Sequence, residues 1–282
     1  MCMELKDKQS LARSDLKHNF LKTIIIRFDF NGISEVELDS TITEIKPLLY
    51  SKGYDRLSIE LATEMDFQLG DPERAEMEGL PIQGVRRQRV YVFKNQIEGI
   101  QLKISPVFAF IFIEKTHYID FKDYSKTLVD VVRIIRDRIP FFNTDRFGLR
   151  KINQCIFTDP NIINDYFEPE FFKLFKFSIG DSSKLTSSKD CFIHNDYNVN
   201  SIRTIIHGEW EEKEAYQVVL DSDVYLLETD IVNELIDSPD KMNPMNELLF
   251  DLYKAVLTDD FIRKLQGETF SDTEIIGVEC NE

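Results

Sequence analysis

The sequence lacks the features that mark several large classes of protein. Its four cysteines, Cys2, Cys155, Cys191 and Cys280, form no CxxC pair and no dense framework, which argues against a zinc ribbon or a disulfide-stapled secreted domain. No apolar run approaches the ~18 residues of a membrane-spanning helix. The N-terminus has no apolar segment of the kind found in signal peptides. We therefore expect a cytoplasmic protein that is not inserted in a membrane.

The familiar signatures of catalysis are also missing. The chain contains no G-x-x-x-x-G-K-[ST], no G-x-G-x-x-G after a strand, no H-E-x-x-H and no G-x-S-x-G. These gaps exclude the common phosphate-cradling loops, zinc proteases and hydrolase elbows. We accordingly expect no cofactor and favour a non-catalytic protein.

Charge is plentiful but unevenly distributed. The chain has 34 Lys+Arg and 50 Asp+Glu, a net charge of −16. Residues 1–150 hold 23 basic and 23 acidic residues, so the remaining 11 basic and 27 acidic residues place the whole excess in 151–282. Such a field repels nucleic acid and attracts basic partners. The one dense basic run, Arg86, Arg87 and Arg89, is typical of a solvated strand edge, with a nucleic-acid contact as the alternative.

Periodicity predicts an α+β protein with the same order of elements in each half. Residues 23–30 alternate between apolar and polar, as a half-buried strand does, and Ser34 and Glu37 form a capping box that opens a helix. The predicted helices span 36–52, 121–138, a broken 161–172, and 244–266; the predicted strands span 23–30, 57–67, 88–94, 99–104, 107–114, 149–158, 191–197, 201–210 and 215–227. We expect two tandem β-α-β-β-β-α halves that form a pseudo-twofold antiparallel sheet with helices on one face.

The predicted boundaries follow from this order. We expect a flexible N-terminus over 1–20, a first α+β half over 21–145, a second over 146–267, and an acidic C-terminal tail over 268–282.

Two sets of side chains suggest metal chemistry. His194 and Asp196 lie two apart on a predicted strand, and His207 and Glu209 lie two apart on the next, so imidazoles and carboxylates could converge on one patch if the strands pair in register. We favour the solvated face of an antiparallel sheet, where polar residues alternate by default, and therefore expect no metal site.

A second pattern suggests a nuclease. Asp196, followed by Glu211 and Lys213 in an E-x-K pattern, matches the acid-then-E-x-K order with which some metal-dependent nucleases hold magnesium. The E-x-K residues fall in a predicted hairpin turn, where charges are usually only solvated.

The most distinctive segment is 145–153. Gly148 permits a backbone geometry that other residues avoid, Arg146 and Arg150 flank it, and Asn153 follows in a strand of otherwise apolar spacing. An arginine supplies several planar donors, and a buried asparagine needs its hydrogen bonds made. The segment is either a polar staple at the junction of the two halves or a site for an anion or peptide.

This segment resembles a family hallmark. Arg146-x-Gly148-Leu149-Arg150-x-Ile152-Asn153 resembles the R-x-G-L-R-Y-I-N motif of a sporadically distributed family of uncharacterised bacterial proteins, with Lys151 where that family usually has Tyr. Tyr118-x-x-Phe121 and the segment 249–259 resemble further parts of it in order, so the likeness spans about 20–266. The resemblance implies a bacterial source and patchy inheritance, as in defence-linked genes, and brings no catalytic residues.

Three functions follow as hypotheses. The first is a non-catalytic interaction or sensor module, in phage defence or a toxin–antitoxin-like pair, that binds a nearby-encoded protein through its acidic second half. The second is the metal-dependent nuclease. The third is a nucleic-acid-binding module based on the arginine run and an element order similar to that of TATA-box-binding proteins.

Overall fold

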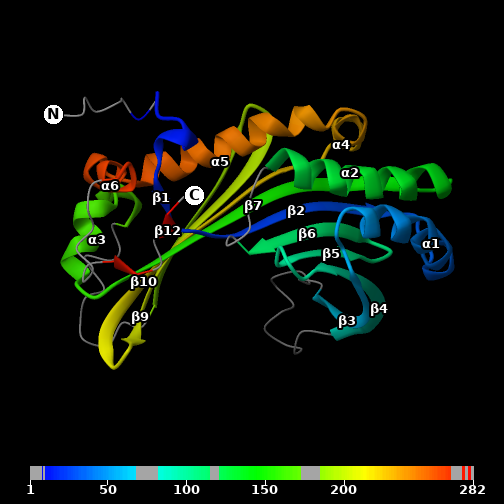
Figure 1. The fold of residues 1–282 in the computed structure, drawn as a ribbon, viewed down its shortest axis with the longest axis horizontal. Helices are drawn as coiled ribbons and strands as arrows, with labels where there is room; N and C mark the ends of the chain where they lie inside the picture. Colours follow the sequence, from blue (N-terminus) through cyan, green and yellow to red (C-terminus); the bar gives the residue numbers. More distant parts are fainter. Residues whose placement is uncertain are drawn as a thin grey trace, which may run out of the picture.

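A large antiparallel sheet with helices along one face forms the body of the protein (Figure 1). A computed structural model describes residues 8, 10–67, 82–114, 121–172, 185–267, 275–276 and 279–280. This confirms the α+β class predicted from sequence. Among the described residues, no helix is both long and apolar enough to span a membrane.

Nine strands make up the main path of the sheet, in the order β3-β4-β5-β6-β2-β7-β10-β9-β8, and the short β11 adds to β7. Their bounds are β2 Leu21–Asn31, β3 Arg56–Phe67, β4 Ile82–Asn95, β5 Ile100–Ile104, β6 Phe108–Glu114, β7 Asn143–Phe157, β8 Leu185–His194, β9 Tyr197–Trp210, β10 Lys213–Leu226 and β11 Ile275–Ile276. A separate two-stranded sheet joins β1 (His18–Asn19) to β12 (Glu279–Cys280).

Strand β7 lies between the two halves of the chain. On one side it pairs with β2, for example Leu149 with Ile26, and on the other with β10, for example Leu149 with Val224. All its neighbours are antiparallel, so a single long strand carries the backbone hydrogen bonds that join the halves.

Six α-helices are described: α1 (Glu35–Ser51), α2 (Phe121–Arg138), α3 (Pro160–Tyr166), α4 (Thr229–Asp237), α5 (Asn243–Val256) and α6 (Asp259–Leu265). The predicted capping box is confirmed, because the Glu37 backbone N–H donates to the Ser34 hydroxyl and the Ser34 N–H donates back to the Glu37 carboxylate. Pro47 lies inside α1 without ending it.

Two apolar cores fill the space between the sheet and the helices. The larger is built from residues such as Ile26, Phe28 and Leu149 under α1, α2, α4 and part of α5. The second surrounds Phe20 and Phe261 near α3 and α6, with rings stacked at 5.4 Å. A small third cluster, Val90, Val92 and Phe108, lies on the opposite face of the sheet.

The prediction of one continuous helix over 244–266 is wrong, because the helix is interrupted near its middle. The chain leaves helical geometry at Leu257, whose backbone bridges to Phe167, and Thr258 then caps α6 by accepting from the Phe261 N–H. The helix α4, which precedes this region, had not been expected.

The predicted strands of the second half also need correction. β8 begins at Leu185, six residues before the predicted strand over 191–197, and ends at His194. Asn195 and Asp196 form the turn into β9, with φ of 47° and 69°, so Asp196 is not on a strand with His194. The full length of β8 could not be predicted from its Ser/Thr/Lys composition, because an edge strand that is exposed on both faces lacks apolar alternation.

The two ends of the chain are more ordered where they are described than we expected. Leu11, Leu16 and Phe20 are buried in the second core, so the described part of 1–20 belongs to the fold. Beyond residue 267, β11 pairs with β7 and β12 pairs with β1.

Lys151 is an unusual core residue. It points from β7 to the helix-covered side of the sheet, where its Nζ donates to Asn246 Oδ1 on α5 at 2.6 Å. Burial, with a smaller contribution from nearby Arg13, lowers the pKa of Lys151 to about 7. The folded protein therefore favours the neutral amine, whereas the unfolded chain holds the proton up to its ordinary pKa near 10.4.

This difference predicts how stability depends on pH. Between pH 7 and about 10 the unfolded chain binds a proton that the folded protein does not, so the free energy of unfolding should rise with pH, by about 3–5 kcal/mol at most. In Lys151→Met the rise should vanish, and the variant should be the more stable one at pH 7 and below. Urea unfolding across this range measures both; an equal slope in the two proteins would contradict the prediction.

Candidate functional site

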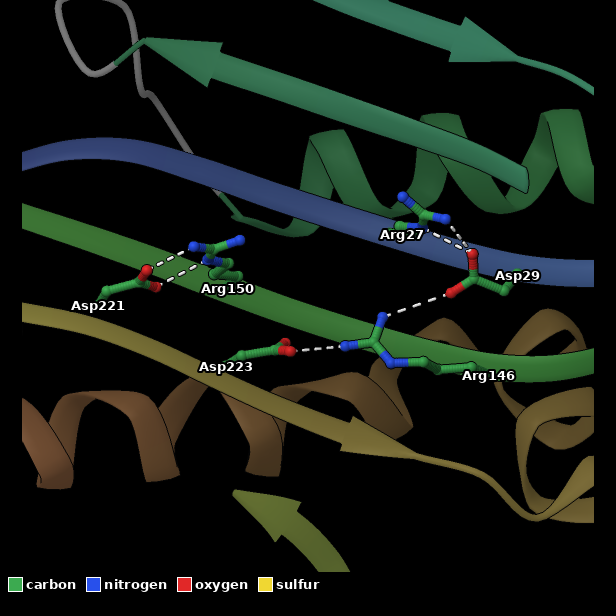
Figure 2. A network of polar contacts seen from close by, with 6 residues as sticks. All are labelled: Arg27, Asp29, Arg146, Arg150, Asp221 and Asp223. Atoms are coloured by element: carbon green, nitrogen blue, oxygen red, sulfur yellow. Dashed lines mark hydrogen bonds and ion pairs between the residues drawn. The ribbon is translucent and has the colours of Figure 1, made fainter. Parts of the chain in front are cut away.

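A row of six charged side chains crosses the centre of the sheet on the face away from the helices (Figure 2). Arg146 on β7 lies in the middle of this row. Its Nη1 lies 3.4 Å from Asp29 Oδ2 on β2, and its Nη2 lies 2.6 Å from Asp223 Oδ2 on β10. One guanidinium thus connects the first half of the chain to the second.

Gly148 makes room for this arrangement. A Cβ at Gly148 would lie 2.6 Å from both terminal nitrogens of Arg146, which share its face of β7. The Arg146 guanidinium also lies 4.7 Å from the centre of the Tyr225 ring. The glycine of the motif is therefore required for the space that the guanidinium occupies, while its φ is unremarkable.

Arg150 makes the second contact across β7 and β10. Its Nε lies 2.7 Å from Asp221 Oδ1, and its Nη2 donates to the other carboxylate oxygen, so the pair is bidentate. Burial raises the pKa of Asp223, although Arg146 and Arg150 act in the opposite direction. Asn153 lies on the helix-covered face, 8% exposed, and its backbone is paired with Leu21 and Leu220.

Arg27 completes the row from β2. Its Nε lies 2.6 Å from Asp29, and its guanidinium lies 4.7 Å from the centre of the Phe108 ring. The row holds three arginines and three aspartates, and each arginine contacts an aspartate. A neutral, internally paired row has little attraction for a free anion, so its chief physical effect is to hold β2, β7 and β10 together.

Gly148→Ala tests this packing. The new methyl group must displace the Arg146 guanidinium from its aspartates, which we expect to cost about 1–2 kcal/mol of stability. The cost should shrink in an Arg146→Ala background, where the space is already free. Gly208→Ala, at a site with nothing within 4 Å of the added Cβ, is the matched control and should change stability little. Strictly additive effects of the Gly148 and Arg146 changes would contradict the packing.

The predicted nuclease residues do not come together. Asp196 and Glu211 occupy the turns at opposite ends of β9, whose 14 residues extend roughly 45 Å. Lys213 begins β10 beside Glu211 and is equally far from Asp196. Within the described residues, no three His, Cys, Asp or Glu side chains are grouped as metal ligands would be.

The two histidines are also separated. His194 pairs with Tyr197 at one end of β9, and His207 lies near the other end, roughly 30 Å away along the strand. His207 stacks on Tyr216 at 4.7 Å, and Glu214 Oε1 lies 2.8 Å from both His207 Nε2 and Tyr216 Oη. This trio braces the end of the β9–β10 hairpin.

The arginine run lies on β4. Arg89 Nη1 is 2.9 Å from Asp39 on α1, so a carboxylate already neutralises it. The backbones of Arg86 and Arg87 pair with Glu64 and Thr63 of β3, and their side chains lie outside the described part of the structure.

The end of the β9–β10 hairpin is an acidic feature that the sequence analysis interpreted only as a solvated turn. We call residues 209–214 the hairpin tip. It contains Glu209, Glu211, Glu212 and Glu214 against one Lys213, and it extends past the last pairs that β10 makes with β7 and β9 makes with β8. Trp210, the single tryptophan of the chain, is 41% exposed there.

Local geometry at the hairpin tip is unfavourable. Glu211 and Glu212 adopt φ of 49° and 64°, as a two-residue turn of this hand requires, although such turns favour Asn and Gly. Glu209 is also directly opposite Glu214, and like charges at paired positions repel. The β8–β9 turn has the same geometry with the suitable residues Asn195 and Asp196.

Exchanging the turn residues should reveal this strain. Glu211→Asn with Glu212→Gly should raise the free energy of unfolding by about 1–2 kcal/mol, because the left-handed conformation costs Glu more than it costs Asn or Gly. The reciprocal change, Asn195→Glu with Asp196→Glu, should lower it by a similar amount. Thermal and urea unfolding compare the three proteins; no gain in the first variant would contradict the strain.

Comparisons with known proteins show no family for this chain. No family model and no curated protein matches the chain. Solved structures with weak similarity to the chain include the following two. The di-domain ARO/CYC StfQ from the steffimycin biosynthetic pathway has 9% identity and a TM-score of 0.18, over 86% of this chain and 99% of that one. The S. pombe Pct1 RNA triphosphatase, in complex with the Spt5 CTD, has 8% identity and a TM-score of 0.14, over 89% of this chain and 86% of that one. Scores this low carry no argument about fold or function.

Proposed function

We propose that this protein is a non-catalytic binding module whose hairpin tip docks on a basic surface of another protein. The observation that carries the proposal is the exposed Trp210, set among four glutamates at the end of a projecting hairpin. An aromatic anchor surrounded by charge is the usual composition of an interface hot spot and its rim.

The arginines described above support this choice, because carboxylates within the protein already pair with them. The arginines of the central row and Arg89 each contact a carboxylate. Among the described residues, by contrast, Glu209, Glu211 and Glu212 have no ion pair. Unpaired acids at a tip attract a basic partner over the ~8–10 Å Debye length and speed its association.

The strain at the hairpin tip also supports the proposal. Glu211 and Glu212 make the turn less stable than Asn and Gly would, and residues that lower stability are commonly retained where they serve a function. With the family resemblance, this extends the proposal to a cytoplasmic interaction or sensor role in a bacterial defence or toxin–antitoxin-like system, with a partner encoded nearby.

Trp210 supplies the test. The chain should be co-purified with the products of the adjoining genes, and the recovered partner titrated against the pure protein while Trp210 emission is recorded. We expect a change in emission on binding and a slower association at high salt. The variant Glu209→Gln/Glu211→Gln/Glu212→Gln should bind at least ten-fold more weakly, as should Trp210→Ala.

A control variant removes three acids elsewhere in the same half. Glu170→Gln/Glu228→Gln/Asp230→Asn changes exposed residues that have no ion pair among the described residues, and it should bind as the parent does. If both triple variants lost the same affinity for the partner, binding would depend only on net charge and not on the hairpin tip. Recovery of the chain alone, with tight binding to bare DNA, would overturn the proposal in favour of nucleic-acid binding.

We also propose that the two halves are related by a pseudo-twofold axis between β2 and β7. Outward from this pair the strands are β6, β5, β4 and β3 on one side, and β10, β9 and β8 on the other. The order of connection is the same on each side, and the first half has one strand more. Superposing β2 and its neighbours on β7 and its neighbours tests the relation.

A further inference from the structure

The two edges of the main sheet are protected differently. β8, at one edge, also exposes Leu185, Phe192 and Ile193, but Lys189 and Asp190 lie between the first of these and the other two, and charges of this kind hinder the addition of a foreign strand to an edge. β3, at the other edge, presents Leu57, Ile59 and Leu61 on one face, exposed by 40%, 58% and 69%.

The exposed row on β3 continues onto α1. Its three residues pair with Phe93, Tyr91 and Arg89 of β4, and α1 reaches β4 through Asp39, which contacts both Tyr91 and Arg89. The helix α1 therefore covers β4, and β3 is the next strand outward from the part of the sheet that the helix covers. Val36 and Tyr50, 79% and 75% exposed, lie on the same side of α1 as Asp39 by helical spacing. Of the twelve large hydrophobic side chains that are exposed in the described part of the structure, five therefore lie on α1 and β3.

We propose that a second copy of this chain covers this surface, with β3 pairing antiparallel to β3 of that copy across a twofold axis. Antiparallel addition is the mode that a twofold axis permits, because each strand then meets its own reversed copy. The result is a sheet continuous through both copies, with the two apolar rows joined on one face.

The charges on the other face of β3 fix the register. Arg56, Ser58 and Glu60 alternate with the apolar row, and Glu60 also contacts Lys103 of its own chain at 3.1 Å. An axis at Ser58 places Arg56 opposite Glu60 of the second copy twice, and Leu57 opposite its Ile59 twice. A twofold axis at Glu60 would place the Glu60 side chains of the two copies opposite each other, and like charges repel. An axis at Ile59 would no longer place Arg56 of one copy opposite Glu60 of the other. A slip of one residue would set apolar against polar positions.

Net charge permits contact at this edge. β3 belongs to residues 1–150, which have 23 basic and 23 acidic residues, whereas the excess of −16 is in the other half. In the strand order β3 is at one edge, and β9 and β8 are at the other. The acidic parts of two copies are therefore far apart when β3 meets β3.

Sedimentation velocity over a range of concentrations measures the association. We expect the full chain to form a dimer with increasing concentration. Ile59→Lys, which places a charge in the apolar row, should abolish it. Ile193→Lys, a matched change at an exposed position on β8, should leave the dimer intact. Unchanged thermal unfolding of both variants will show that they fold.

A cross-link tests the register. In a background with Cys2, Cys191 and Cys280 replaced by serine, which leaves the buried Cys155 as the one native cysteine, Ser58→Cys faces its own copy. Paired residues of antiparallel strands have Cα atoms about 4.5–5.5 Å apart, within disulfide range. Mild oxidation should then form a disulfide between two copies of the Ser58→Cys variant, while the Glu60→Cys variant should remain without a cross-link. A monomer at every concentration, a dimer that survives Ile59→Lys, or equal cross-linking of both cysteine variants would overturn the proposal.

Discussion

The pairing of β7 with both β2 and β10 is the constraint on which the rest of the structure depends. Every backbone hydrogen bond between the two halves within the main sheet passes through this strand. Its register decides which side chains face the helices and which face away, since a slip of one residue would exchange the two sets. Leu149 and Phe147 then fall in the main core, and Arg146 and Arg150 fall in the charged row. The arginines favour this register because it brings Asp29, Asp221 and Asp223 within reach of them.

The local parts of the fold could be predicted from the sequence, and the long-range parts could not. The alternation over 23–30 and the Ser34 capping box involve neighbours along the chain, and both are present. The interruption at Leu257 depends on Phe167, ninety residues earlier, and no local pattern contains that contact. Similarly, the separation of Asp196 from Glu211 follows from two hairpin turns, one of which is formed by glutamates that do not favour it.

The candidate site divides in the same way. The motif at 146–153 singled out unusual residues on β7, but sequence could not say that Arg146 spans the strands while Asn153 faces the helices. That distinction needs the parity of the strand and the identity of both neighbours. For the hairpin tip a signal was present: two strands joined through Glu-Glu, where Asn-Gly is usual, already indicate a turn held for a reason other than stability.

The two proposed contact surfaces are compatible in one assembly. A dimer joined at β3 has the β8–β9–β10 side of each copy at its far ends, because these strands lie at the opposite end of the sheet order. Both hairpin tips then remain free, each in the half of the chain that carries the excess negative charge. Two identical sites on a rigid sheet bind a repeated or dimeric partner more tightly than one site does, provided that their spacing matches. The neutral half thus suits self-association, and the acidic half suits recognition of a partner of opposite charge.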